Sequence, residues 1–347
     1  MMTTPMRATI KDIASRAGVS KTTVSFALNN PKRISRGTYD KIMAIIKELG
    51  YFPNPVARTL TTKRLGALGL LLPQPISEVM NNPHLCDVIS GIGEECDKHE
   101  ISLTMLPPVQ GKIIEAARRA FVDAIVTIGV GPEHEVIDFL IKHRVPFVTI
   151  DSEETEAAVN IGIQHEQAAY DLMRYILSTR PSGIAVLCLK PDAKNHMERS
   201  RSVVLEKRLD GFSRALGEFG LSLRSDRVHV IEAEGSFEGG RVAGQSLLGN
   251  SDRPDTIVAM ADIVALGVYA AANEREILIP DQLSIAGFDD IVLGRFARPS
   301  LTTIHQPAKE KGLKAASLAI DILNGGKAEH FNFPYTLEIR GSTKPAR

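Results

Sequence analysis

The chain has 347 residues, of which 44% are hydrophobic and 24% are charged, so it is long enough for a small domain beside a larger one with a sizeable core. The formal net charge is zero, but residues 1–64 hold 12 Lys and Arg against 3 Asp and Glu, whereas the remaining residues hold 29 against 38. The basic first part is typical of a phosphate-binding surface, and the acidic remainder is not expected to bind nucleic acid by itself.

The cysteines and the N-terminal residues exclude several classes of protein. Cys86, Cys96 and Cys188 have neither the spacing of a metal cluster nor that of a disulfide framework, so we expect them to be reduced and packed. The first residues lack the apolar segment of a signal peptide, and no apolar run approaches the length of a membrane span. We therefore expect a cytoplasmic protein with no membrane contact, no metal and no cofactor.

The first predicted element is a short helix that ends at a glycine. Ile10, Ile13, Ala14 and Ala17 repeat with the i, i+3, i+4, i+7 spacing of one helix face, and Gly18 follows them. A second helix is expected over residues 21–28, after a tight turn. This pattern fits a helix-turn-helix and an ordinary helical hairpin about equally well.

The second helix is expected to expose a polar face. Ser20 stands at its N-cap position, where the hydroxyl can accept a backbone N–H of the first turn. At 100° per residue its apolar side chains fall on one side. The other side holds Lys21, Thr22, Ser25, Phe26 and Asn29. A polar second helix of this kind is what a helix-turn-helix presents to the DNA major groove.

Two more helices complete the first part of the chain. Ser35 can cap a third helix that ends at Leu49, with Gly50 at its C′ position. Further on, Asn54 can cap a two-turn helix in which Pro55 is the first residue. Because two turns are too short to be stable alone in water, we expect this helix to form only when two copies pack together on DNA. The alternative is a plain linker whose apolar residues contact only the headpiece.

From residue 65 onward, buried-strand patterns alternate with helical patterns. The predicted strands are 65–72, 103–106, 124–128, 147–150, 184–189, 228–231, 256–260 and 284–288. The predicted helices are 88–98, 113–121, 135–143, 166–177, 205–219, 241–248 and 263–275. This alternation predicts an α/β fold of parallel sheets covered by helices, and its length favours two lobes over one.

Several motifs resemble the LacI/GalR family of bacterial transcription regulators. Residues 8–14 (ATIKDIA), 18–20 (GVS) and 23–25 (TVS) resemble the family headpiece, and 50–54 (GYFPN) and 56–60 (VARTL) resemble its hinge. The motifs that resemble its effector-binding core are 122–126 (VDAIV), 145–151 (VPFVTID), 208–212 (RLDGF), 262–267 (DIVALG), 279–290 (IPDQLSIAGFDD) and 299–307 (PSLTTIHQP). The resemblance covers nearly the whole chain.

The resemblance implies an all-α helix-turn-helix headpiece over 1–52, a hinge helix and linker over 53–64, and an effector-binding and dimerisation core over 65–347. The core is expected to have two doubly wound parallel-sheet lobes, like a periplasmic sugar-binding protein. Lobe 1 is predicted at about 65–163 and 291–325, and lobe 2 at about 164–290 and 326–342. The chain would cross between them near 160–164, 287–292 and 324–333.

The resemblance also assigns roles in DNA binding. Base reading is expected from Lys21, Thr22 and Phe26, and phosphate contact from Ser20, Thr23 and Ser25; the full predicted set adds Asn29 in the headpiece and Ala57, Leu60 and Thr61 in the hinge. Leu60 matches the position that wedges into a minor-groove base step. Phe26 departs from the family, in which a polar or basic residue is commoner, so either its ring contacts a thymine methyl or it packs against the hinge or the third helix.

A cleft between the lobes is expected to bind the effector. Asp289 follows a predicted strand at the sheet edge where open α/β sheets bind ligands, and its carboxylate can accept two vicinal hydroxyls. The predicted effector residues are Asp289, Arg208, Asp151, Gln306, His84 and Phe237. The alternative for Asp289, Arg208, Asp151 and Gln306 is an ion pair between the lobes or at the surface. Since Ala261, Gly235, His84 and Leu85 replace residues that are often polar or aromatic in the family, the effector is expected to be unusual, anionic because of Arg208, or not a sugar.

These features predict a transcription regulator that acts as a repressor. It is expected to bind a palindromic operator in double-stranded DNA as a homodimer. A small polar effector, such as a sugar or a related metabolite, is expected to control this binding. No apolar heptads occur in 340–347, so the dimer is expected not to form tetramers. One alternative is a solute-binding protein or a metabolite sensor without strong operator specificity. Another is a nucleotide-dependent enzyme, but 129–131 (GVG) lacks the third glycine of the dinucleotide fingerprint and no nucleophile elbow occurs, so we expect no enzyme activity.

Overall fold

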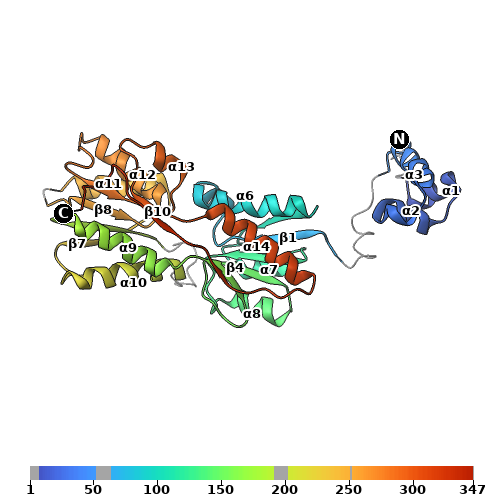
Figure 1. Cartoon of the computed structure of the whole chain (residues 1–347), viewed down its shortest axis with the longest axis horizontal. Helices are drawn as coiled ribbons and strands as arrows, with labels where there is room; N and C mark the ends of the chain where they lie inside the picture. The colour runs from blue at the N-terminus through green and yellow to red at the C-terminus, as the bar shows by residue number, and fades with distance from the viewer. Residues whose placement is uncertain (1–7, 52–63, 191–201, 251, 347) are drawn as a thin grey trace. The chain divides into compact units, whose positions relative to one another are not determined.

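The computed structural model describes residues 8–51, 64–190, 202–250 and 252–346 (Figure 1). The chain divides into two compact units, Met1–Leu65 and Gly66–Arg347. The first unit contains α1 (Ile10–Ala17), α2 (Lys21–Asn29), the 3-10 turn η1 (Pro31–Arg33) and α3 (Arg36–Glu48). This order confirms the predicted three-helix headpiece. The predicted hinge helix, with Ala57, Leu60 and Thr61, lies outside the described residues.

Local capping decides where the headpiece helices begin and end. The Ser20 hydroxyl accepts the backbone N–H of Thr23 at 3.1 Å, and the Ser35 hydroxyl accepts that of Thr38 at 3.3 Å. Gly18 ends α1 with a φ of 67°, a left-handed conformation that costs a glycine little. These are the caps that the sequence predicted. They satisfy backbone groups that a helix end would otherwise leave without partners.

The predicted apolar faces of the three helices meet in one small core. Its buried members are Ile13, Ala14, Ala17, Val24, Ala27, Ile42, Ile45, Ile46 and Tyr51. All three helices contribute to this set, which leaves the polar side of α2 outside the core.

The second unit contains two parallel sheets. The first has the strand order β11-β5-β4-β3-β1-β2, and the second has the order β7-β6-β8-β9. The first consists of β1 (Ala67–Leu71), β2 (Ser102–Leu106), β3 (Ala124–Ile128), β4 (Phe147–Ile150), β5 (Val159–Gly162) and β11 (Phe331–Asn332). The second consists of β6 (Ile184–Leu189), β7 (Val228–Ala233), β8 (Thr256–Ala259) and β9 (Ser284–Ala286). Every pairing within them is parallel.

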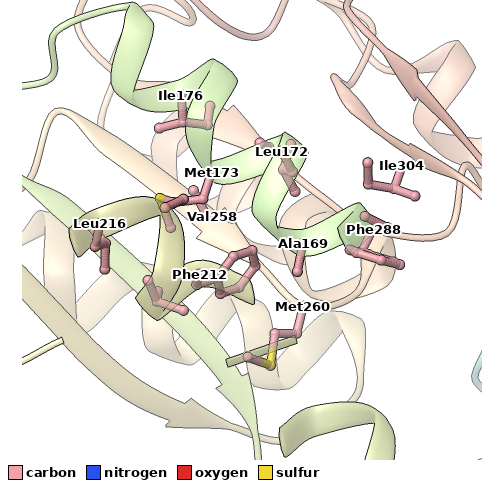
Figure 2. Packing of buried hydrophobic residues seen from close by; sticks show 14 of the residues in the cluster. Ala169, Leu172, Met173, Ile176, Phe212, Leu216, Val258, Met260, Phe288 and Ile304 are labelled. Carbon is pink, nitrogen blue, oxygen red and sulfur yellow. The ribbon is translucent and has the colours of Figure 1, made fainter. Parts of the chain in front are cut away.

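Helices cover both faces of each sheet, which confirms the doubly wound fold. On the first sheet, α6 (Pro83–Lys98) and α14 (Ala308–Leu323) share one buried cluster, and α7 (Ile113–Arg119) and α8 (Glu135–Lys142) share another. On the second sheet the two pairs are α9 (His165–Ser178) with α10 (Val203–Glu218), and α11 (Phe237–Leu248) with α12 (Asp262–Asn273). Figure 2 shows the cluster beneath α9 and α10, to which Phe212, Met173 and Met260 all belong.

The crossings between the lobes differ in part from the prediction. Ile291, Leu301 and Ile304 pack in the second lobe, because their side chains complete its two apolar clusters. The short helices α5 (Ile76–Met80) and α13 (Val292–Phe296) and the antiparallel pair β10 (Thr303–His305) and β12 (Thr336–Glu338) were not predicted. The chain therefore leaves the second lobe after β10, not near 287–292. It returns after β11, which pairs with β5 in the first lobe, so residues 326–332 do not belong to lobe 2.

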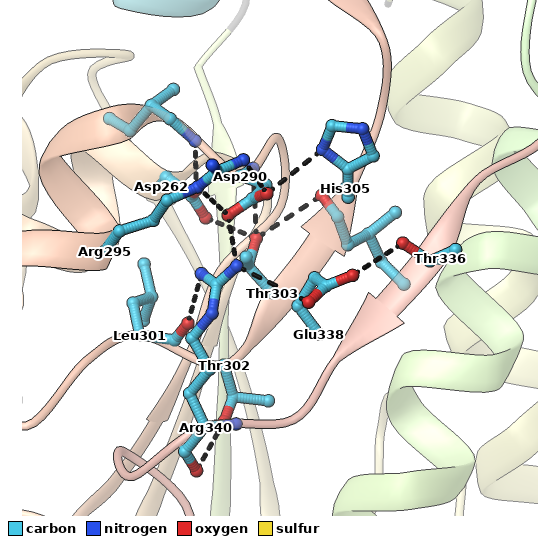
Figure 3. Close-up of polar contacts among 12 residues, drawn as sticks. Asp262, Asp290, Arg295, Leu301, Thr302, Thr303, His305, Thr336, Glu338 and Arg340 are labelled. Atoms are coloured by element: carbon cyan, nitrogen blue, oxygen red, sulfur yellow. Dashed lines mark hydrogen bonds and ion pairs between the residues drawn. The ribbon is translucent and has the colours of Figure 1, made fainter.

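An ion-pair cluster around Asp290 joins the C-terminal segment to the loop after β9 (Figure 3). Its carboxylate lies 2.6 Å from Arg295 Nη2, 2.7 Å from Arg340 Nη2 and 3.0 Å from His305 Nδ1. Burial would raise the pKa of Asp290, but the two guanidinium groups hold it below its ordinary value. The cluster thereby stabilises the backbone position of the neighbouring residue, Asp289.

Candidate functional site

A cavity of about 260 Å³ lies between the two lobes. Its walls include residues just after β3 and β4 of the first sheet and just after β8 and β9 of the second. These are the carboxyl ends of the strands, where doubly wound sheets bind ligands. The volume of about 260 Å³ fits a small ligand and lies just below the range of about 300–1,000 Å³ for ligand pockets.

Four of the six predicted effector residues line this cavity: Asp289, Arg208, Asp151 and His84. Gln306 is buried beside it and donates to Asp289. Phe237 does not line it, because this residue begins α11 and its side chain is 44% exposed. The prediction that Phe237 contributes to the effector site is therefore wrong for this cavity.

Arg208 and Asp289 form the second-lobe side of the site. Arg208 extends from α10, and its Nη2 lies 3.7 Å from Asp289 Oδ1. Its guanidinium stacks 3.6 Å from the centroid of the Phe288 ring and donates to the backbone carbonyl of Met260. Burial raises the pKa of Asp289 to about 6, although Arg208 opposes this. These contacts hold the guanidinium in one orientation.

The two cavity carboxylates have unusual backbone conformations. Asp289 has a φ of 130° and Asp151 a φ of 54°, both in the region that side chains other than glycine rarely adopt. Such strain persists only where the surroundings enforce it, and it is common at ligand-binding sites. Each aspartate directly follows a buried strand or its immediate extension, so the strand fixes the position of the carboxylate.

A buried chain of polar groups links the carboxylates across the lobes. Lys311 Nζ on α14 lies 2.5 Å from Asp151 Oδ2 and 2.8 Å from Gln306 Oε1. Gln306 Nε2 in turn donates to Asp289 Oδ1 at 2.6 Å. Lys311 is fully buried. The chain runs through the crossing segment after β10, so it couples the first-lobe carboxylate to the second-lobe carboxylate.

Burial lowers the pKa of two histidines beside this chain of polar groups. His165 Nε2 lies 3.0 Å from Asp151 Oδ1, and burial lowers the pKa of His165 to about 4 although Asp151 opposes this. Burial, and then the Lys311 ammonium, hold the pKa of His84 well below its ordinary value. Within the described residues, His84 Nδ1 and Arg208 Nε are buried and have no hydrogen-bond partner. Since buried polar groups are normally satisfied, these two atoms at the cavity are suited to a polar ligand.

Sequence reasoning missed Lys311, His165 and Asp262. Asp262 begins α12, accepts the Ile291 backbone N–H at 2.9 Å and accepts the Thr303 hydroxyl at 2.6 Å. Burial and then the Asp289 carboxylate raise the pKa of Asp262 to about 8. A lysine and an aspartate at positions that are otherwise apolar in their helices were signals that could have found two of them. No comparable signal marked His165.

In the headpiece, α2 presents the predicted polar face. Lys21 and Thr22 are exposed, whereas Ser25 and Phe26 are partly buried. The Ser20 and Thr23 hydroxyls lie 2.9 Å apart in the cap. Asn29 lies in the last position of α2. Phe26 is not part of the described headpiece core, and Arg33 stacks on its ring.

Known proteins are similar to this chain both in the headpiece and in the two-lobed core. Residues 9–54 match the family described as bacterial regulatory proteins, lacI family, and residues 157–343 match the periplasmic binding protein-like domain. The chain is 30% identical to catabolite control protein A of Priestia megaterium over 98% of its own length and 100% of that protein. The chain belongs to the LacI family. It is a transcriptional regulator with a helix-turn-helix headpiece.

Other relatives of this LacI-family regulator agree. It is 30% identical to the HTH-type transcriptional regulator DegA of Bacillus subtilis (strain 168) over 98% of this chain and 99% of that protein. Its fold matches a lac repressor dimer bound to operator and the anti-inducer ONPF with a TM-score of 0.79, 21% identity, and coverage of 97% of this chain and 99% of that chain. Across the described part of the chain, no helix has both the length and the apolar character that a membrane span needs.

Proposed function

We propose that this LacI-family regulator is a cytoplasmic repressor that binds a palindromic operator as a homodimer and responds to a small polar effector in the cavity between its lobes. The observation that carries the proposal is the cavity lined by Asp289, Arg208 and Asp151, in a chain whose α2 also exposes Lys21 and Thr22. One headpiece per chain buries little surface on DNA, so two copies at two half-sites account better for tight binding. We propose no catalytic role for any residue of the cavity.

The charges around the cavity indicate what the effector offers. Arg208 lies beside Asp289, and Lys311 lies beside Asp151, so each carboxylate already has a cation. An effector therefore need not bring a charge of its own, which argues against the anionic ligand that Arg208 alone suggested. We propose an uncharged molecule whose hydroxyl or amide groups donate to the two carboxylates and accept from Arg208 Nε.

For DNA, we keep the roles expected from the sequence except that of Phe26. Lys21 and Thr22 reach base edges from α2, and Ser20, Thr23 and Ser25 contact phosphates. Ala57, Leu60 and Thr61 act in a hinge helix that folds only on the operator, with Leu60 as the minor-groove wedge. A ligand that changes the angle between the lobes would then change the separation of the two hinges.

Selection of binding sites from a random pool of DNA duplexes tests the proposal. The purified full chain should enrich a sequence with two symmetric half-sites, and Lys21→Ala should enrich a more degenerate one while the salt dependence of binding changes little. Lys41→Ala, a charge on α3 outside the reading helix, is the matched control and should enrich the wild-type sequence. A protein that binds small molecules but binds every duplex equally would instead be a sensor without operator specificity.

A further inference from the structure

One aromatic–cation contact lies at the edge of the reading face of α2. The Arg33 guanidinium carbon lies 5.4 Å from the centroid of the Phe26 ring, within the range of about 6 Å for a cation–π interaction. Phe26 is partly buried and Arg33 is exposed. The Phe26 ring thus supports the guanidinium, and the guanidinium remains accessible to solvent.

The backbone between these two residues is held by successive hydrogen bonds. Asn30 N–H donates to the Phe26 carbonyl at 2.8 Å, and Arg33 N–H donates to the Asn30 carbonyl at 3.0 Å. Ile34, which follows, packs partly buried against the headpiece core. The η1 turn therefore fixes the position from which the Arg33 side chain extends, directly beside the last turn of α2.

Arg33 also has no competing anion in the part of the chain that the structure describes. Among the described residues, no carboxylate lies within 4.0 Å of its guanidinium, whereas Arg16 in the same headpiece forms an ion pair with Glu48. Stacking on a ring leaves the N–H edge of a guanidinium available, since the ring contacts only its flat face. At 100° per residue Phe26 lies on the polar side of α2 with Lys21 and Thr22. The Arg33 guanidinium therefore lies beside that polar side of α2.

We propose that Arg33, carried on the ring of Phe26, is a base-reading residue of this regulator and recognises guanine in the major groove. Guanine presents two acceptors, N7 and O6, and a guanidinium held edge-on can donate to both. This assigns a role to Phe26 different from contact with a thymine methyl. The inference rests on the proposed operator binding by α2.

The test repeats the selection from random duplexes with four variants of the full chain. Wild type should enrich a guanine at one position of each half-site, and Arg33→Ala should lose that preference by on the order of tenfold while it keeps the other positions. Arg33→Lys retains the charge but not the planar fork, so it should also lose most of the preference. Phe26→Leu should weaken the preference for guanine at the same position. Lys32→Ala, the neighbouring exposed cation on η1, should enrich the wild-type sequence.

A combined Phe26→Leu, Arg33→Ala variant distinguishes two explanations. Either Phe26 acts by supporting Arg33, or the two residues contact the DNA independently. If the ring acts through Arg33, the combined variant should lose no more preference than Arg33→Ala alone. Arg33→Ala that enriches the wild-type sequence, with only a uniform loss of affinity and a smaller salt slope, would show a phosphate contact and overturn the inference. A wild-type protein that enriches no common sequence would overturn the proposed operator binding as well. Unchanged thermal unfolding of the headpiece in each variant shows that its fold is intact.

Discussion

Replacing Lys311 by methionine should destabilise the core strongly. The ammonium is fully buried and lies 2.5 Å from Asp151 Oδ2 and 2.8 Å from Gln306 Oε1. Methionine fills a similar volume, so the main effect is an Asp151 carboxylate whose remaining side-chain partner among the described residues is His165. Removing one member of a buried ion pair typically costs about 3–5 kcal/mol. With an m-value of about 3 kcal/mol/M, this is a fall of roughly 1–2 M in the urea midpoint.

The effect should depend on pH in a defined direction. In wild type, burial would raise the pKa of Asp151, but Lys311 and then His165 outweigh it and hold the pKa below its ordinary value. The charged form then stabilises the fold at every pH above that ordinary value, about 3.9. Without Lys311, burial dominates and the folded pKa rises above the unfolded one, so protonation favours the fold. The difference in free energy of unfolding between wild type and Lys311→Met should therefore become smaller as the pH falls from 7.5 to 5.

Urea unfolding of the full chain, followed by the signal of the core, measures both effects. The combined Asp151→Asn, Lys311→Met variant should recover much of the loss, because a neutral pair replaces the stranded carboxylate. A loss below about 1 kcal/mol for Lys311→Met, or a loss that is the same at pH 5 and pH 7.5, would refute the buried ion pair.

Three further outcomes follow from particular contacts. Gly91→Ala should lower the free energy of unfolding in urea by about 1–3 kcal/mol or more, because a Cβ would lie 2.0 Å from a backbone oxygen of α14. Gly93→Ala, on the same helix, is the control: its Cβ meets nothing within 4 Å, so this variant should be as stable as wild type or more stable. Ser20→Ala should lower headpiece stability by about 1 kcal/mol in thermal unfolding; no change would contradict the cap. Since the pKa of Asp262 is raised to about 8, its protonated form favours the fold, and wild type should lose stability relative to Asp262→Asn as the pH rises from 5 to 8; a constant difference would contradict this.

Local signals in the sequence were sufficient for the headpiece and for most of the two sheets. Ser20 and Gly18 mark helix ends through hydrogen bonds and backbone conformations that depend on nearby residues alone. β3 and β4 are buried along their whole length and are apolar apart from one threonine each, so their ends were predicted correctly. Asp289 was placed at the cavity by its position after β9.

The parts that could not be predicted depend on contacts between distant residues. The buried face of α14 consists largely of alanine, glycine and Lys311, which gives a weak apolar stripe and hides the helix. Lys311 is buried only because Asp151, 160 positions away, supplies a carboxylate. The crossing after β10 was misplaced for a similar reason: Leu301 and Ile304 fill second-lobe clusters made by helices far away in the sequence.

The central claim is that a ligand in the inter-lobe cavity controls operator affinity through Asp289. Its most direct test first screens a library of uncharged polyols and amides for the metabolite that most raises the thermal stability of the wild-type protein. Operator binding by wild type and by Asp289→Asn is then measured with and without this metabolite. Asparagine keeps an acceptor for Gln306, so basal operator affinity should remain within about twofold of wild type. The metabolite should change wild-type operator affinity by about 5–150-fold, the usual range of allosteric coupling, and that of Asp289→Asn by less than about twofold. An equal response in the variant would contradict the claim.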